Sequence, residues 1–207
     1  MMRKAIFLIS LLAVFCFSIS AHQSFLSGTQ TAPSKSEPQG SATSSQPVQQ
    51  SIRGTIYDNA TAHFTLTVPK DWVVSDALMK QLPGIVGALA APGGSAAIMV
   101  QRYYVPGPKE GAKFLDSQFK NSFQDYRKLS EGPMKIDGKD GYTFTFHTLF
   151  PFGPPEKHVQ LPVRLVIVLI PDGESVLGFT CQAPESGFSD FEPTLNAIVT
   201  SFRSNKQ

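Results

Sequence analysis

The clearest alternation of apolar and hydroxyl side chains in the chain predicts a β-strand. In an extended conformation Phe64, Leu66 and Val68 lie on one face, and Thr65 and Thr67 lie on the other. Such a strand covers a core with its apolar face only. We therefore expect the folded part of the chain to begin close to this strand.

Further short apolar runs predict a series of strands joined by turn residues. The expected strands are Gly54–Asp58, Ala62–Val68, Ile85–Ala91, Ser95–Tyr104, Arg127–Ile136, Tyr142–Leu149, Val163–Ile170 and Val176–Gln182. Asp137-Gly138 favours a tight hairpin turn, and Val163–Ile170 has the apolar character of a central strand. Because most neighbouring strands are joined by short turns, the sheet should be mainly antiparallel.

Two amphipathic helices are expected to cover this sheet. Apolar residues recur near helical period between Glu110 and Tyr126, and again from Phe191 to Phe202, with Pro193 in the first turn. A short helix is also expected from Ser75 to Leu82. The predicted fold class is α+β, a mainly antiparallel β-sheet sandwiched by helices.

The N-terminal part of the chain has the composition of an export signal followed by a tether. Residues 1–21 combine a basic start, an apolar run and small residues, which predicts a secretory signal peptide. The alternative is an uncleaved membrane anchor. Residues 22–51 are rich in Ser, Gln, Thr and Pro and predict a disordered linker, so the folded domain should span residues 52–207. We expect an exported protein, periplasmic or secreted.

The charge distribution argues against nucleic acid as a partner. The chain has 18 Lys and Arg against 16 Asp and Glu, and Arg3 and Lys4 lie in the expected signal peptide. Without these two residues the balance is 16 against 16, with the two signs interspersed. Nucleic acids and polyanionic lipids require a concentrated basic surface, so any membrane contact should come only from an uncleaved N-terminal segment.

No catalytic or metal-binding motif emerges from the residue types and their spacing. The sequence around Ser175 lacks the second glycine of a nucleophile elbow, and Cys181 has the apolar neighbours of an inert core thiol. The histidines His63, His147 and His158 are not spaced to converge on a metal ion. We therefore expect no enzyme activity, no cofactor and no metal site.

A proline-stiffened loop is the best candidate for an interaction site. It contains Phe150, Phe152 and His158, and prolines would present the two rings at low entropic cost. Tyr103 and Tyr104 would join this surface if both loops lie at one end of the sheet. The alternative is that Phe150 and Phe152 fold back and plug the end of the core.

The chain resembles the PsbP-like fold family, which includes exported bacterial proteins of the DcrB type. The similarity lies in residues 64–72, in residues 95–102, in the Asp137-Gly138 hairpin and in residues 163–203, and it covers nearly everything from Ile52 onward. The resemblance implies an accessory or binding module without an active site, and it carries no functional residue onto this chain. The family also includes the extrinsic PsbP subunit of photosystem II. Because the chain shows no match to the N-terminal region of that subunit, the resemblance does not imply a photosynthetic role.

These observations lead to two expected functions. The first is a non-enzymatic accessory domain that binds an unknown protein partner in the cell envelope. The alternative is a carrier of a small apolar ligand, in a pocket between sheet and helix lined by Phe114, Phe119 or Phe144.

Overall fold

The computed structural model describes residues 54–75, 79, 84–152 and 159–205. The expected signal peptide and linker, His158 and most of the helix expected over 75–82 lie outside these residues.

Antiparallel strands make up most of the described chain. In chain order the elements are β1 (Gly54–Asn59), β2 (Phe64–Pro69), β3 (Val73–Val74), β4 (Ile85–Ala90), the 3₁₀ turn η2 (Pro92–Gly94), β5 (Ala97–Tyr103), α3 (Pro108–Ser122), β6 (Gln124–Ile136), β7 (Lys139–Phe152), β8 (Val159–Asp172), β9 (Ser175–Pro184), the 3₁₀ turn η4 (Glu185–Gly187), α4 (Phe188–Thr200) and β10 (Arg203–Ser204).

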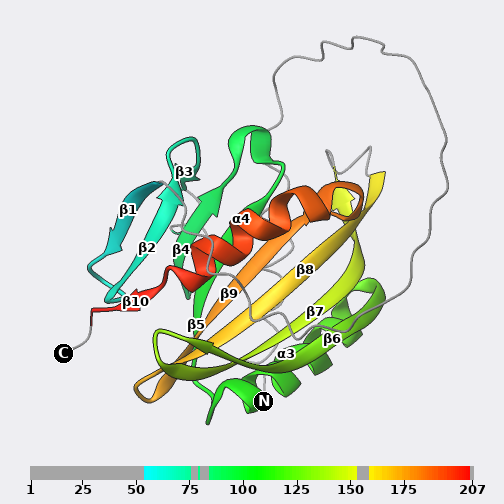
Figure 1. Cartoon of the computed structure of the whole chain (residues 1–207). Coiled ribbons are helices and arrows are strands. Elements are labelled where there is room, and N and C mark those ends of the chain that lie inside the picture. The colour runs from blue at the N-terminus through cyan, green and yellow to red at the C-terminus, as the bar shows by residue number, and fades with distance from the viewer. Residues whose placement is uncertain (1–53, 76–78, 80–83, 153–158, 206–207) are drawn as a thin grey trace, which may run out of the picture.

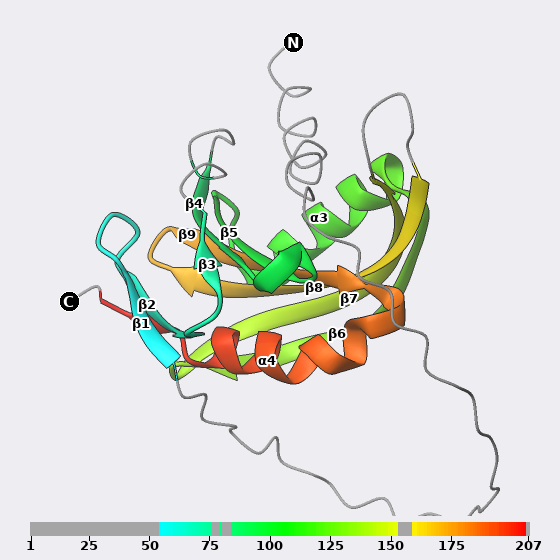
Figure 2. The same cartoon turned by 90° about the horizontal axis from the view of Figure 1, so that it is seen from above.

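The strands form a large sheet and a small one. The large sheet has seven strands in the order β3-β4-β5-β9-β8-β7-β6, and the small sheet has three in the order β1-β2-β10. Every strand pair is antiparallel. Helix α4 lies on one face of the large sheet and α3 on the other, as Figure 1 and Figure 2 show. The fold is therefore the α+β sandwich expected from the sequence.

The core on the α4 face joins the two sheets around Phe64 of β2. Its ring lies 6.3 Å from that of Phe179 on β9 and 5.9 Å from that of Phe202, which follows α4. Tyr57 of β1 adds an edge-on contact at 6.2 Å. Full burial of a phenylalanine contributes about 1.5–3 kcal/mol through area removed from water, so Phe64 is a central stabilising residue of this core.

The core on the α3 face is dominated by stacked and tilted phenylalanines. Phe119 on α3 contacts Phe146 on β7 at a ring distance of 5.1 Å, and Phe144 stacks on Phe146 at 5.9 Å. Phe123 closes the far end of this cluster against Phe150, with 5.2 Å between the rings. The apolar face expected for β7 is thus confirmed, and the helix expected to cover it lies there.

Two helix boundaries differ from the sequence prediction. Helix α3 ends at Ser122, and Phe123 is already extended, so the stretch expected to be helical up to Tyr126 belongs to strand β6. Both rings still contact Phe146: Phe123 directly follows the helix, and Tyr126 lies within the first register shift of β6. Helix α4 begins at Phe188, so Pro193 lies inside it and not in its first turn. In the described part of the chain, no helix is long and apolar enough to span a membrane.

Candidate functional site

The two loops that the sequence suggested as one surface lie at opposite ends of the sheet. Tyr103 pairs with Val176 on β9, and Val176 pairs with Pro171 on β8. Phe150 pairs with Leu161, ten residues earlier on the same strand β8. At about 3.4 Å per residue the two positions are roughly 30 Å apart along the strand. Tyr103 and Tyr104 therefore do not join Phe150 and Phe152.

The two tyrosines differ in exposure at their own end of the sheet. The Tyr103 hydroxyl donates to Oε1 of Gln101 at 2.9 Å and is buried, which raises its pKa. Tyr104 is 84% exposed, but its neighbour Tyr103 packs inward against the α3 core. A single exposed tyrosine is common on protein surfaces and indicates no binding site by itself.

Phe150 fills the core and does not present its ring to solvent. It is 2% exposed and packs on Phe123 at the end of α3. The physical reason is strand length: β7 continues to Phe152, so Phe150 belongs to the alternating pattern of a strand and not to a loop. For this residue the structure agrees with the alternative of a core plug.

The β7–β8 hairpin extends beyond both neighbouring strands. The last pair between β7 and β6 is Leu149 with Gln124, and the last pair between β8 and β9 is Val163 with Pro184. Residues 150–152 and 159–162 therefore form a two-stranded ribbon that no further described strand flanks. We call this ribbon the hairpin tip. It lies at the end of the yellow strands in Figure 1, next to the undescribed residues 153–158.

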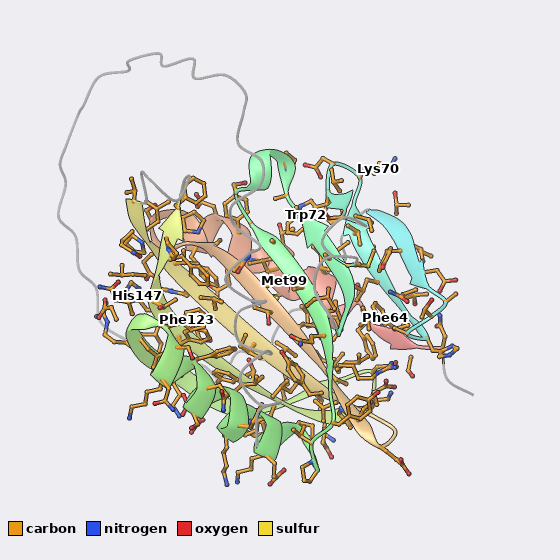
Figure 3. All side chains as sticks on the ribbon, turned by 180° about the vertical axis from the view of Figure 1, so that it is seen from behind. Phe64, Lys70, Trp72, Met99, Phe123 and His147 are labelled. Carbon is orange, nitrogen blue, oxygen red and sulfur yellow. The ribbon has the colours of Figure 1, made fainter. Side chains whose placement is uncertain are left out.

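The hairpin tip carries an apolar pair at its end. Phe152 lies directly opposite Val159, which is 59% exposed, whereas Phe152 is half-buried. Opposite residues of an antiparallel pair point to the same face, and alternation places both on the α3 side of the sheet. The apolar stripe of that face thus continues past Phe123, where the cover provided by α3 stops; Figure 3 labels Phe123 at this end of the helix.

Sequence reasoning named Phe152 but missed Val159. The signal was present, because Val159, Leu161 and Val163 alternate with polar or proline residues in the manner of a strand. The prolines nearby favoured a loop, and the strand was predicted to start at Val163. Val159 is thus part of the site through a strand extension that the proline-rich composition concealed.

A charged cluster lies on the other face at the base of the hairpin tip. Nε2 of His147 is 3.3 Å from the Asp125 carboxylate, and its Nδ1 is 3.4 Å from the Glu185 carboxylate. Arg164 forms an ion pair with Glu185 through two nitrogens. This guanidinium, aided by His147, holds the pKa of Glu185 below its usual value.

The backbone also contributes to this cluster. Asp125 has a positive φ of 53° within a register shift of β6, and bulges commonly redirect a side chain in this way. His147, labelled in Figure 3, lies on β7, Arg164 on β8 and Glu185 on η4, so with Asp125 of β6 the cluster joins four elements. The cluster therefore links the base of the hairpin tip to β6 and η4.

The other groups considered for chemistry have structural roles. Burial raises the pKa of Cys181 to about 12, which keeps the thiol protonated and inert. The Ser175 hydroxyl donates to the backbone oxygen of Asp172 in the β8–β9 turn. Within the described residues, no group of three or more His, Cys, Asp or Glu side chains is arranged to hold a metal ion.

A pocket of about 360 Å³ lies between the small sheet and the β4 end of the large sheet. It is lined by Tyr57, Met79, Ile85, Val86 and the turn residues 58–61. This is not the sheet–helix pocket expected for an apolar carrier, because neither Phe119 nor Phe144 lines it. Both residues pack against other aromatic rings. Phe114 is half exposed on α3. A carrier function therefore stays a prediction.

Asn59, which lines this pocket, begins the glycosylation sequon Asn59-Ala60-Thr61 and holds the turn after β1. Its Oδ1 accepts from the backbone N–H of Ala62 at 2.8 Å, and its Nδ2 donates to the Tyr57 hydroxyl and to the Val86 carbonyl. A glycan attached to this nitrogen would leave it one N–H, so Asn59 could not donate to both acceptors. The residue is therefore used for turn formation and for joining the two sheets.

Comparison with known proteins gives similarity at the level of the fold. No family model matches the chain, and no curated protein matches it in sequence. The solution structure of cyanobacterial PsbP (CyanoP) from Synechocystis sp. PCC 6803 is similar, with a TM-score of 0.55 and 14% identity over 79% of this chain and 98% of that one. The Ran-binding protein Mog1p of Saccharomyces cerevisiae is also similar, with a TM-score of 0.53 and 13% identity over 75% of this chain and 97% of that one.

Proposed function

We propose that this chain, whose fold is PsbP-like, is an exported accessory domain that binds a protein partner in the cell envelope through its hairpin tip. The observation that carries the proposal is the exposed Val159, which lies opposite the half-buried Phe152 at the end of a ribbon that extends beyond the sheet.

The chemistry of the hairpin tip favours a protein partner. Aromatic side chains are enriched in protein interfaces, and the residues that contribute most to binding lie in desolvated pockets near the centre of the contact. Here the stripe includes Phe150, which is buried against Phe123, and ends in Val159, which is 59% exposed. Side chains that are already ordered before binding lose less entropy on binding.

Export is supported by the signal-peptide pattern of residues 1–21. The cysteine content of the rest of the chain is compatible with export. A single buried thiol, Cys181, is compatible with an oxidising compartment because it has no partner for a wrong disulfide within the folded domain. The Ser- and Gln-rich composition of residues 22–51 is that of a linker between the export signal and the folded domain.

The test compares charge insertion at the hairpin tip with charge insertion at a matched apolar position. Val159→Lys should weaken partner capture from the native envelope fraction by about tenfold or more, since it places a charge in an apolar contact. Leu129→Lys is the control, because Leu129 is 50% exposed on the edge strand β6, away from the hairpin tip.

Both variants should retain the wild-type circular dichroism spectrum and denaturation midpoint, because neither side chain is buried. Phe152→Ala should weaken capture as Val159→Lys does. The proposal is wrong if Val159→Lys captures the same proteins in the same yield as the wild type, or if both lysine variants lose them equally.

A further inference from the structure

Strand β1 is an edge strand with few of the features that prevent edge-to-edge pairing, since Asp58 is its only charged residue. It pairs with β2 on one side and with no described strand on the other, and Figure 1 shows it at the periphery of the molecule. Its six residues run in unbroken register with β2 and contain no proline. Ile56, near its centre, is 70% exposed.

The other long edge of the described sheets shows the opposite design. Strand β6 carries two register shifts, Pro133 and a series of charged side chains that includes Lys128 and Glu131. Bulges, prolines and charges are the features by which natural sheets block pairing at an edge. The remaining edges, β3 and β10, are two residues long. An edge such as β1 is a template for another strand.

From this contrast we propose that β1 pairs with β1 of a second copy of this chain, antiparallel across a two-fold axis at Ile56. The pairing would join two small sheets into one continuous sheet of twice the strand number, with an isologous interface. This inference concerns a surface separate from the hairpin tip and does not depend on the proposed partner.

The residues of β1 fit this register. Antiparallel pairing about Ile56 places the two Ile56 side chains opposite each other, and β-branched apolar pairs stabilise neighbouring strands. Asp58 then faces Gly54, so no carboxylate lies opposite another one. Pairing centred on Tyr57 would instead place Ile56 opposite Asp58, which loses both advantages.

The course of the chain also favours the antiparallel arrangement. Residues 1–53 precede β1 and enter it at Gly54. In an antiparallel pair of β1 strands, the preceding residues of the two copies join the pair at opposite ends, whereas in a parallel pair they would join it at the same end.

Gly54 is required for the close contact with β2, because a Cβ there would lie 2.2 Å from the Val68 oxygen.

Engineered cysteines test the register directly. In the full-length chain carrying Cys16→Ser, Ile56→Cys should form an intermolecular disulfide under mild oxidation. Directly opposite Cα atoms in an antiparallel pair are about 4.5–5.5 Å apart, which suits a disulfide. The matched control is Asp58→Cys, on the same exposed face, whose two copies would be roughly 13 Å apart and should not crosslink. Cys181 does not interfere because it is buried.

The mass of the wild-type chain measured by light scattering should rise toward that of a dimer with concentration, and Ile56→Lys should remain monomeric. The proposal is overturned if the wild type is monomeric at every concentration, which would point to a different occupant of the edge. It is also overturned if Asp58→Cys crosslinks as fast as Ile56→Cys, since that result indicates random collision or another register.

Discussion

At the scale of single residues, the anchor of the small sheet is Phe64 and not the tryptophan that ends the same stretch. Phe64 is fully buried between both sheets and α4, whereas Trp72 is half-buried against the same core. The alternating pattern predicted which face of β2 is buried. It did not predict this ranking, because the burial of Trp72 depends on a turn after Pro69 and on the distant strand β4.

Truncation of the two rings should therefore have unequal effects. Phe64→Ala should lower the free energy of unfolding by about 3–5 kcal/mol, because it leaves a cavity at the junction of three elements. Trp72→Ala should cost roughly 1–3 kcal/mol, since part of its ring is already solvated. Urea denaturation monitored by circular dichroism measures both, and a larger loss for Trp72→Ala would contradict this ranking.

The ion pair of Glu185 gives the stability a pH dependence of known sign. Arg164 lowers the pKa of the folded-state carboxylate, so its stabilising contribution is present above the unfolded-state pKa of about 4.3 and is lost as the pH falls through the folded-state pKa. Glu185→Gln should be less stable than the wild type at pH 7, and the difference should shrink in acid. An equal difference at pH 7 and at acidic pH would show that the carboxylate charge is not responsible.

At the scale of elements, the turns and the buried faces followed from local sequence, whereas the ends of the strands did not. Asp137 and Gly138 both have positive φ, as their type of turn requires. The overhang of the β7–β8 hairpin, by contrast, depends on where β6 and β9 stop. That is a property of four strands together, which no local pattern contains. The same limit explains why Phe150 was placed in a loop.

Close strand packing at the start of β7 provides a test of the sheet geometry. A Cβ on Gly141 would lie 2.7 Å from the Leu169 oxygen of the neighbouring strand, so Gly141→Ala must displace backbone and should cost about 1–3 kcal/mol. Gly132→Ala, on the edge strand β6, meets no atom within 4 Å and should be neutral within roughly 0.5 kcal/mol. Chemical denaturation of the two variants checks the difference, and equal losses would contradict the packing described.

At the scale of the whole molecule, the large sheet carries a helix on each face, with the hairpin tip and the small sheet at its periphery. The sequence was sufficient for the fold class because its alternation, its turns and its two amphipathic helices agree with one another. It was not sufficient for the site. The predicted surface combined Tyr103 and Tyr104 with Phe150 and Phe152, and only the strand pairing shows that these pairs lie at opposite ends.

The most direct measurement of the central proposal is photo-crosslinking in intact cells of the native source. A photoreactive amino acid in place of Val159 should form a covalent adduct with one discrete envelope protein, because this position lies at the exposed end of the apolar stripe. The same amino acid in place of Leu129 should form none. Absence of an adduct at Val159, or identical adducts at both positions, would contradict binding through the hairpin tip.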